Sequence, residues 1–217
     1  MSEKFRDSVW DRHGVVDKIV GSTKIPKFAK VRQIFEDNTI KDIPAAVAKE
    51  FARPEVAARI KPGMTIAVTV GSRGLANLKF LVKETVAQIR KLGGKPFIFP
   101  AMGSHGGATA EGQRQVLESY GVTEDFIGAP IKSSMETVVI GRVPDGRTVH
   151  MDKNASEADG VVLLARVKPH TAFRGEYESG LMKMLAIGVA KQEGAESCHS
   201  HGFGEMAKNV VDFGSVY

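Results

Sequence analysis

The apolar positions of the chain alternate between strand-like and helix-like spacing after residue 60. Residues 61–71, KPGMTIAVTVG, are a turn and a β-branched apolar run, and residues 95–101, KPFIFPA, are a second short run. Between them, residues 77–94 place their apolar side chains on one helical stripe and end at two glycines. A strand, a helix and a strand with short joints predict a right-handed βαβ unit and a parallel sheet. The stripe consists of Leu78, Leu81, Val82, Ile89 and Leu92.

The second half of the chain adds three further helices and a hairpin. Residues 108–122 predict a helix that ends at a glycine, and residues 135–150 predict a hairpin with Pro-Asp-Gly in its turn. Residues 180–192, GLMKMLAIGVAKQ, predict a single helix. Another helix is expected to begin near Gly204.

A third strand is expected over residues 159–167, DGVVLLARV. This run is continuously aliphatic, which is typical of a central parallel strand covered on both faces. Together these patterns predict an α/β fold, with an open, mainly parallel, Rossmann-like sheet flanked by helices and a β-hairpin insertion.

The first sixty residues show no sustained period, because prolines interrupt mixed segments. Residues 43–60 carry strong helix formers on either side of Pro54, and Asp42 can cap the start of a helix there. We therefore expect residues 1–60 to be an irregular and helical N-terminal segment of one α/β domain that covers residues 1–217.

The composition points to a globular protein of the cytoplasm. Hydrophobic residues make up 42% of the 217 positions, enough for a core, and no apolar run approaches a membrane span. Residues 1–14 lack the pattern of a secretory signal, and Cys198 is the single cysteine, so a reduced, intracellular compartment is expected.

The charge pattern favours small anionic ligands over nucleic acid or membrane partners. The formal net charge is +5, but the lysines and arginines are scattered among acids rather than gathered into a run. A mildly basic surface raises the local concentration of anionic substrates or phosphate-bearing cofactors. The sequence is compatible with a homo-oligomer but does not set the oligomeric state.

Each predicted strand of the parallel sheet runs into a short segment that carries a group able to bind or transfer charge. The segments are GSRG (71–74), GSHGG (103–107) and KPH (168–170). Because all carboxyl ends of parallel strands lie on one edge, we expect Arg73 and the two histidines, His105 and His170, to share a neighbourhood.

Each of these residues also has a purely structural interpretation. A Gly-Ser-Arg-Gly turn is commonly just a tight loop, and a lone histidine is commonly a hydrogen-bonded structural residue. Two histidines at adjacent strand ends favour function more strongly, since imidazole titrates near pH ~6.5 and a facing pair can act as acid and base.

Lys183 lies within the apolar helix-like run and has apolar neighbours one turn away. One interpretation is that its stem packs on these neighbours while its ammonium group reaches water. The other is that apolar surroundings lower its pKa, so that it becomes a nucleophile or a covalent anchor. Spacing alone does not separate the two.

Residues 197–202, SCHSHG, contain further ligand types. Cys198, His199 and His201 lack the paired spacing of a structural zinc site, and the two histidines would point in different directions on a helix. One metal ligand is expected here, but not a closed site. His13 and His150 are interpreted as ordinary surface or hairpin residues.

The motifs GSRG, MGSHGG, KPHTAFRG, ESGLMKM and GAESCHSHG, in this order from Gly71 to about Gly202, resemble the nickel-dependent lactate racemase family. The resemblance implies a racemase or epimerase of a 2-hydroxy acid that works by hydride transfer. It implies the nickel-pincer nucleotide, a nickel-bearing pyridinium-dithiocarboxylate mononucleotide bound covalently to a lysine, and therefore the enzymes that synthesise it as partners.

The same resemblance implies roles for individual residues. Lys183 would tether the cofactor, and His199 would be the nickel ligand. His105 and His170 would flank the substrate as acid and base. Arg73, with Ser72 beside it, would contact the cofactor phosphate or the substrate carboxylate. A second, C-terminal lobe, which closes the cleft in that family, would lie outside this chain.

Some positions depart from the family pattern. Val70, Gly71 and Ser72 stand where racemase-type members carry an aspartate before the arginine, and glycines follow His105. These differences concern the substrate, so the hydroxy acid is not identified by the resemblance. Two other functions remain: a zinc-dependent hydrolase or lyase that uses the same histidines, and a non-catalytic anion-binding module.

Overall fold

The computed structural model describes residues 14, 18–19, 21–22, 24 and 26–217. The chain divides into two units, Met1–Thr39 and Ile40–Tyr217. In the first unit, residues 26–39 have no regular secondary structure and their side chains are exposed. His13 and most of the segment tested for a secretory signal lie outside the described residues. Among the described residues, no helix is both long and apolar enough to cross a membrane.

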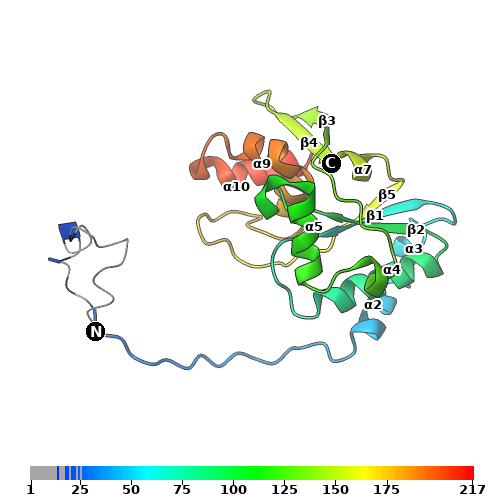
Figure 1. The fold of residues 1–217 in the computed structure, drawn as a ribbon, viewed down its shortest axis with the longest axis horizontal. Helices are drawn as coiled ribbons and strands as arrows, with labels where there is room; N and C mark the ends of the chain where they lie inside the picture. The colour runs from blue at the N-terminus through cyan, green and yellow to red at the C-terminus, as the bar shows by residue number, and fades with distance from the viewer. Residues whose placement is uncertain (1–13, 15–17, 20, 23, 25) are drawn as a thin grey trace. The chain divides into compact units, whose positions relative to one another are not determined.

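The second unit is built on a parallel sheet of strand order β2-β1-β5 (Figure 1). The strands are β1 (Thr65–Val70), β2 (Lys95–Pro100) and β5 (Gly160–Val162), and β1 pairs in parallel with both neighbours. Helix α4 (Leu78–Lys91) connects β1 to β2. The predicted βαβ unit and α/β fold class are therefore confirmed.

One face of the sheet packs against α4. Its buried side chains Val82, Val86 and Ile89 lie in the same apolar cluster as Val68 and Ile98 of the strands. α4 ends where Gly93 adopts a φ of +87°, a conformation that glycine reaches without steric cost, as the two glycines predict.

Two short helices precede the sheet, where one helix was expected. α2 (Ile43–Phe51) begins at Asp42, whose carboxylate accepts a 2.9 Å hydrogen bond from the Ala45 amide, so the predicted cap is confirmed. α2 ends before Pro54, and α3 (Pro54–Ala57) starts there, because proline fits the first turn of a helix but not its interior.

The other face of the sheet carries the hairpin and the C-terminal helices. The predicted hairpin forms from β3 (Thr137–Arg142) and β4 (Thr148–Asp152), which pair antiparallel, and α7 (Lys153–Ser156) follows. α9 (Lys191–His199) and α10 (Met206–Gly214) pack together and, with the hairpin, enclose a second apolar cluster around Cys198 and Phe213.

The remaining elements are short or flank the sheet. The predicted helix over residues 108–122 appears as α5 (Ala110–Ser119), and the helix expected near Gly204 as α10 after the 3-10 turn η4 (Phe203–Glu205). A second 3-10 turn, η2 (Gly106–Ala108), precedes α5, and α6 (Glu124–Ile127) follows it.

The third strand differs from its prediction. β5 pairs over three residues, is half-buried, and lies at the edge of the sheet rather than at its centre. The central position belongs to β1, which is buried along nearly its whole length. The aliphatic run that contains β5 continues beside β1 after Val162, as the 2.8 Å bond from the Leu164 amide to the Thr69 hydroxyl shows. Aliphatic composition reports burial by any neighbours and does not distinguish a central strand from a covered edge.

The predicted single helix over residues 180–192 is also interrupted. α8 (Leu181–Lys183) continues into the π-helical segment η3 (Met184–Val189). α9 then begins at Lys191, whose φ of +56° breaks the regular helix. The Gly188 carbonyl, inside η3, accepts a 3.1 Å bond from the Gly103 amide of another loop. Such π segments often occur at functional sites.

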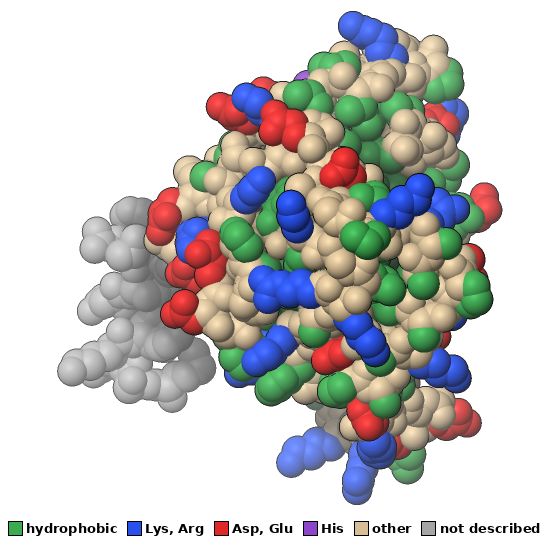
Figure 2. All heavy atoms as spheres, turned by 90° about the vertical axis from the view of Figure 1, so that its right-hand side faces the viewer, with side chains coloured by type: hydrophobic (Ala, Val, Ile, Leu, Met, Phe, Trp, Pro, Cys, Tyr) green, Lys and Arg blue, Asp and Glu red, His purple; other side chains and the backbone are tan. Residues whose placement is uncertain are grey.

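Charged side chains on the surface are interspersed rather than clustered. Figure 2 shows lysine and arginine side chains mixed with acidic and hydrophobic ones across the face it presents. This distribution agrees with the scattered charges of the sequence.

The close packing of η3 on the end of β2 is testable at Gly188. A Cβ added there would lie 2.7 Å from the Ala101 carbonyl oxygen and 2.7 Å from the Met184 sulfur. We expect Gly188→Ala to lower the free energy of unfolding by about 1–3 kcal/mol, since overpacking forces backbone shifts. Urea denaturation measures the change. Gly204→Ala is the control, because a Cβ at Gly204 meets nothing within 4 Å; equal effects of the two variants would contradict this packing.

Candidate functional site

The loops after β1 and β2 lie side by side at the carboxyl edge of the sheet. The Ala101 amide donates a 2.9 Å bond to the Val70 carbonyl, which joins the two strand ends. Beyond this bond, the Ser72 hydroxyl forms a short hydrogen bond with Nδ1 of His105. The GSRG and GSHGG loops are thus held together by a direct side-chain contact.

The backbone of Ser72 is itself held by a hydrogen bond. The Tyr120 hydroxyl donates a 2.6 Å bond to the Ser72 carbonyl, and this ties the loop to the end of α5. Since Ser72 bonds Nδ1, Nε2 is the ring nitrogen of His105 that stays available for a ligand. Ser72 therefore orients His105 in this structure, and its predicted contact with a cofactor stays a prediction.

Charge links His105 to two cations from other segments. Burial, followed by the positive charges of Arg73 and Lys183, lowers the pKa of His105. Arg73 comes from the loop after β1 and Lys183 from the last residue of α8, so three separate segments meet here. The expected gathering of Arg73 and His105 is reproduced, and Lys183 joins them.

His170 lies in a loop of residues 168–180 that is closed at its base. The Ser179 hydroxyl accepts a 2.7 Å bond from the Lys168 amide and donates to the Lys168 carbonyl. Within the loop, the Glu178 carboxylate accepts a 2.7 Å bond from the His170 amide. These bonds hold the third motif in a compact conformation.

The ring of His170 is fixed by two contacts. It stacks on Phe173 with ring centroids 4.3 Å apart, and its Nδ1 accepts a 3.1 Å bond from the Ala172 amide. A neutral ring whose Nδ1 accepts carries its proton on Nε2, so His170 is a hydrogen-bond donor in this state. Burial, followed by the charge of Lys183, lowers its pKa, and the nearby Glu178 opposes this shift.

Lys183 is half-buried, which lies between the two interpretations of its sequence position. Burial, followed by the charges of Lys168 and Arg73, lowers the pKa of its amine. Its charge also acts on both histidines, so Lys183 is the group that links His105 to His170 electrostatically. Hydrogen bonding and charge therefore connect five candidate residues, which are Arg73, Ser72, His105, His170 and Lys183.

His199, the last residue of α9, has the tautomer of a metal-binding histidine. Its Nδ1 lies 2.6 Å from the Ala195 carbonyl oxygen, so Nδ1 carries the proton and Nε2 keeps its lone pair. Among the described residues, no hydrogen bond, ion pair or ring contact joins His199 to Lys183, His105 or His170. The nearest link is Cys198, whose thiol and the Lys183 amine act on each other's pKa.

The neighbours of His199 do not form a metal site with it. Cys198 is fully buried, and burial raises the pKa of its thiol to about 12, so it remains protonated. His201 faces Asp145 instead, at 3.8 Å. Among the described residues, no group of three or more His, Cys, Asp or Glu side chains is placed to hold a metal ion.

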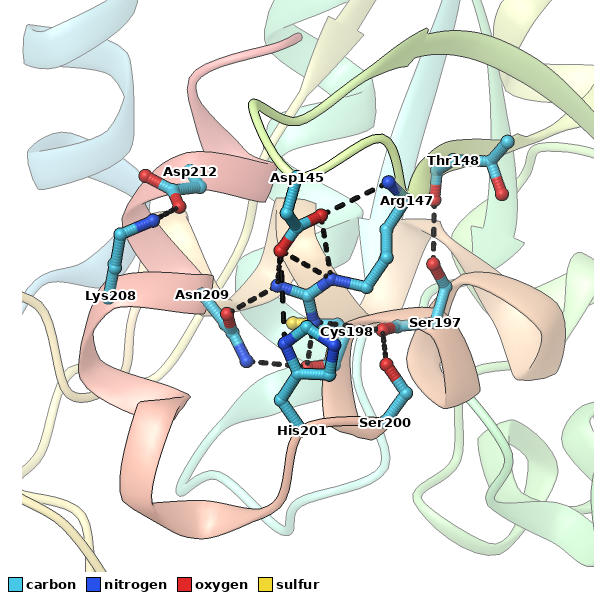
Figure 3. A network of polar contacts seen from close by, with 10 residues as sticks. All are labelled: Asp145, Arg147, Thr148, Ser197, Cys198, Ser200, His201, Lys208, Asn209 and Asp212. Atoms are coloured by element: carbon cyan, nitrogen blue, oxygen red, sulfur yellow. Dashed lines mark hydrogen bonds and ion pairs between the residues drawn. The ribbon is translucent and has the colours of Figure 1, made fainter.

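Arg147 fastens the end of α9 that presents His199 (Figure 3). Its guanidinium forms a bidentate pair with Asp145, lies 2.7 Å from the Asn209 Oδ1 atom, and donates to the Ser197 carbonyl at 3.2 Å. The Asn209 amide donates to the Cys198 carbonyl at 2.9 Å. These bonds satisfy carbonyls at a helix C-terminus, where a cation also interacts favourably with the helix dipole.

Sequence reasoning missed two of these supporting residues. Glu178 belongs to the ESGLMKM motif and Arg147 to the predicted hairpin, but neither was predicted to support the site. The position of Arg147 directly after a Pro-Asp-Gly turn gave no signal of its contacts with α9, fifty residues later.

A comparison with known families shows the family of this chain. The model of the family described as lactate racemase N-terminal domain matches residues 22–210, so the chain belongs to this family. A comparison with curated proteins found no match.

The electrostatic link between Lys183 and the two histidines predicts a coupled titration. We expect Lys183→Met to raise the pKa of both His105 and His170, because a cation that disfavours their protonation is removed. Histidine NMR titrations measure both midpoints, which in the unsubstituted chain should lie below the ordinary value of about 6.5. Lys208→Met is the control, since Lys208 is exposed and paired with Asp212.

The sign of the histidine shifts also fixes a pH dependence. Below pH ~6.5 the unfolded chain takes up protons that the folded histidines resist, so stability should fall on acidification through that range. A Lys183→Met variant that leaves both midpoints unchanged would show that the amine lies too far away to act.

The bonds of Arg147 predict a stability effect that depends on its planar fork. We expect Arg147→Lys to lower the free energy of unfolding by about 1–3 kcal/mol, because a lysine cannot serve Asp145, Asn209 and the helix carbonyls together. Arg142→Lys on the same hairpin is the control, since Arg142 is exposed, and its effect should stay within about 0.5 kcal/mol. Similar losses in both variants, measured by thermal unfolding, would refute this role.

Proposed function

We propose that this member of the lactate racemase N-terminal domain family is the cofactor-bearing domain of a racemase or epimerase acting on a 2-hydroxy acid. Two observations support the proposal: a hydrogen bond joins the loops after β1 and β2 at His105, and the charge of Lys183 acts on both His105 and His170. A second lobe outside residues 1–217 would complete the cleft around the substrate.

The described residues fit a nickel-pincer nucleotide. Lys183 offers an amine whose pKa is lowered, as a covalent tether requires, and His199 offers a free Nε2 lone pair for nickel. A metal held mainly by an organic ligand and one histidine needs no cluster of protein ligands. Bound there, the nucleotide would supply an acceptor and donor of hydride at the carbinol carbon of the substrate.

The two histidines would handle the proton of the substrate hydroxyl. Inverting the carbinol carbon requires a base on either face, and a base must be neutral before it acts. The pKa of both rings is lowered, which favours the neutral form at neutral pH. His105 would take the proton at Nε2. Nε2 of His170 carries a proton in this structure, so His170 would take a proton on the opposite face only after its tautomer changes and Nε2 is free.

Arg73 would bind the anionic end of the ligand. A guanidinium matches a carboxylate or phosphate through two parallel hydrogen bonds. Its side chain is exposed, and its charge acts on both His105 and Lys183. It would therefore orient the substrate or the cofactor phosphate relative to the amine and the imidazole.

The zinc hydrolase alternative requires three protein ligands around the metal. Within the part of the chain that the structure describes, the histidines, Cys198 and the acids form no such set. The anion-binding alternative shares Arg73 with our proposal, and it is separated from it by the catalytic test below.

The covalent tether is tested by mass. The full-length protein, produced together with the enzymes that synthesise the cofactor, should carry a covalent adduct that maps to Lys183. Lys183→Arg should abolish the adduct, whereas Lys168→Arg, a neighbouring lysine in the same charge cluster, should retain it. Stoichiometric zinc without an adduct under these conditions would favour the hydrolase.

The reaction is tested by screening short 2-hydroxy acids for loss of optical activity with the loaded protein. The double variant His105→Ala, His170→Ala should lower kcat by at least about 10²-fold, since positioned acid–base groups contribute that much each. A double variant that keeps the full rate of the unsubstituted protein would refute the acid–base roles, and a binding function that it retains would favour the anion-binding module.

A further inference from the structure

A lysine and an aspartate are completely buried behind the candidate site. Lys191 and Asp152 are each 0% exposed, and the Nζ and Oδ2 atoms lie 3.1 Å apart. Burial lowers the pKa of Lys191 and raises that of Asp152, and the attraction between them opposes both shifts. Because desolvating such a pair is costly, a buried pair is weak evidence for stability and raises the question of another role.

The ammonium group of Lys191 joins segments that are far apart in the sequence. It donates a 2.6 Å bond to the Pro100 carbonyl, at the end of β2, and a 3.0 Å bond to Oε1 of Gln113 on α5. Asp152, at the end of β4, is the third partner. The ammonium group therefore donates two hydrogen bonds to protein oxygens and forms an ion pair with the third partner, Asp152.

Gln113 passes this connection on to the loop that carries His105. Gln113 is also 0% exposed, and its amide nitrogen donates to the Gly103 carbonyl at 2.8 Å and to the His105 carbonyl at 3.2 Å. The amide oxygen faces Lys191, so the ammonium fixes which way the amide points. A continuous chain of bonds thus runs from Lys191 to the backbone of His105.

Lys191 is also the first residue of α9, two residues after the end of the segment that presents Lys183. Its φ of +56° is unusual for a residue with a side chain and marks the junction between η3 and α9. Such conformations persist where the surroundings over-determine them. The buried head of Lys191 provides that constraint, so one residue fixes both the end of η3 and the loop of residues 103–107.

We propose that Lys191 is a positioning residue which, acting through Gln113, sets the place of the His105 imidazole relative to the Lys183 amine. Its importance for turnover rests on the proposed function, but the placement itself does not. Among the described residues, no hydrogen bond or ion pair joins Lys191 to the His105 imidazole or the Lys183 amine. Its effect passes through the amide of Gln113 and the backbone of His105.

Gln113→Glu tests the relay at its central link. The glutamate keeps an oxygen for Lys191 but loses the two N–H bonds to the loop carbonyls. We expect the side-chain NMR signals of His105 to shift or broaden, while those of His150 and His201 stay in place as internal references. Gln115→Glu, an exposed glutamine on the same helix, is the matched control and should leave His105 unchanged.

Activity gives a second readout in the full-length, cofactor-loaded protein. Gln113→Glu should lower kcat by about 10²-fold with little change in KM, as expected when a reacting group is misplaced rather than when substrate binding is lost. If Gln113→Glu does not fold, Gln113→Met removes the two bonds to the loop carbonyls, together with the bond from Lys191, without adding a buried charge, and the His105 signals are read in the same way.

The outcomes separate this proposal from the proposed function. Unchanged His105 signals in a folded Gln113 variant, or equal shifts of all histidine signals, would overturn the positioning role. A selective shift of His105 in a protein that racemises no hydroxy acid would support the positioning role and refute the proposed reaction.

Discussion

The parallel pairing of β1 with β2 and β5 is the constraint on which the rest of the structure depends. Parallel strands end on the same edge of a sheet, so the loops that follow β1 and β2 are brought together whatever their own sequences are. This arrangement allows the bond between Ser72 and His105. It also brings the positive charges of Arg73 and Lys183 close enough to act on His105. A chain with the same motifs on antiparallel strands would place them at opposite ends.

Electrostatics then gives this edge its chemical character. Burial, followed by nearby charges from other segments, lowers the pKa of both histidines and of the Lys183 amine, which shifts each group toward its neutral form. Behind the loop that carries His105, the fully buried Lys191, Asp152 and Gln113 connect strand ends, α5 and the hairpin through hydrogen bonds and an ion pair. The loop that carries His105 is thus held by polar side chains that are buried from solvent.

Local patterns predicted those elements whose cause is local. The stripe of α4, the cap at Asp42 and the Pro-Asp-Gly turn depend on residues within a few positions of each other, and all three are present. The predictions that were wrong, a central third strand and one helix over residues 180–192, concern elements whose form depends on distant contacts. β5 is short because its length depends on how far the neighbouring strand β1 pairs with it. η3 is a π segment that packs on the loop of residues 103–107.

The sequence by itself determined the fold class, the family resemblance and which side chains could do chemistry, since these follow from periodicity and from the order of short motifs. The tertiary structure alone decided which of these side chains meet, the tautomers of His170 and His199, and the burial of Lys191. Lys191 sits in the sequence as an ordinary lysine at the end of an apolar run. Its partners Pro100 and Gln113 lie 91 and 78 residues away, so no local pattern could reveal that its charge is buried.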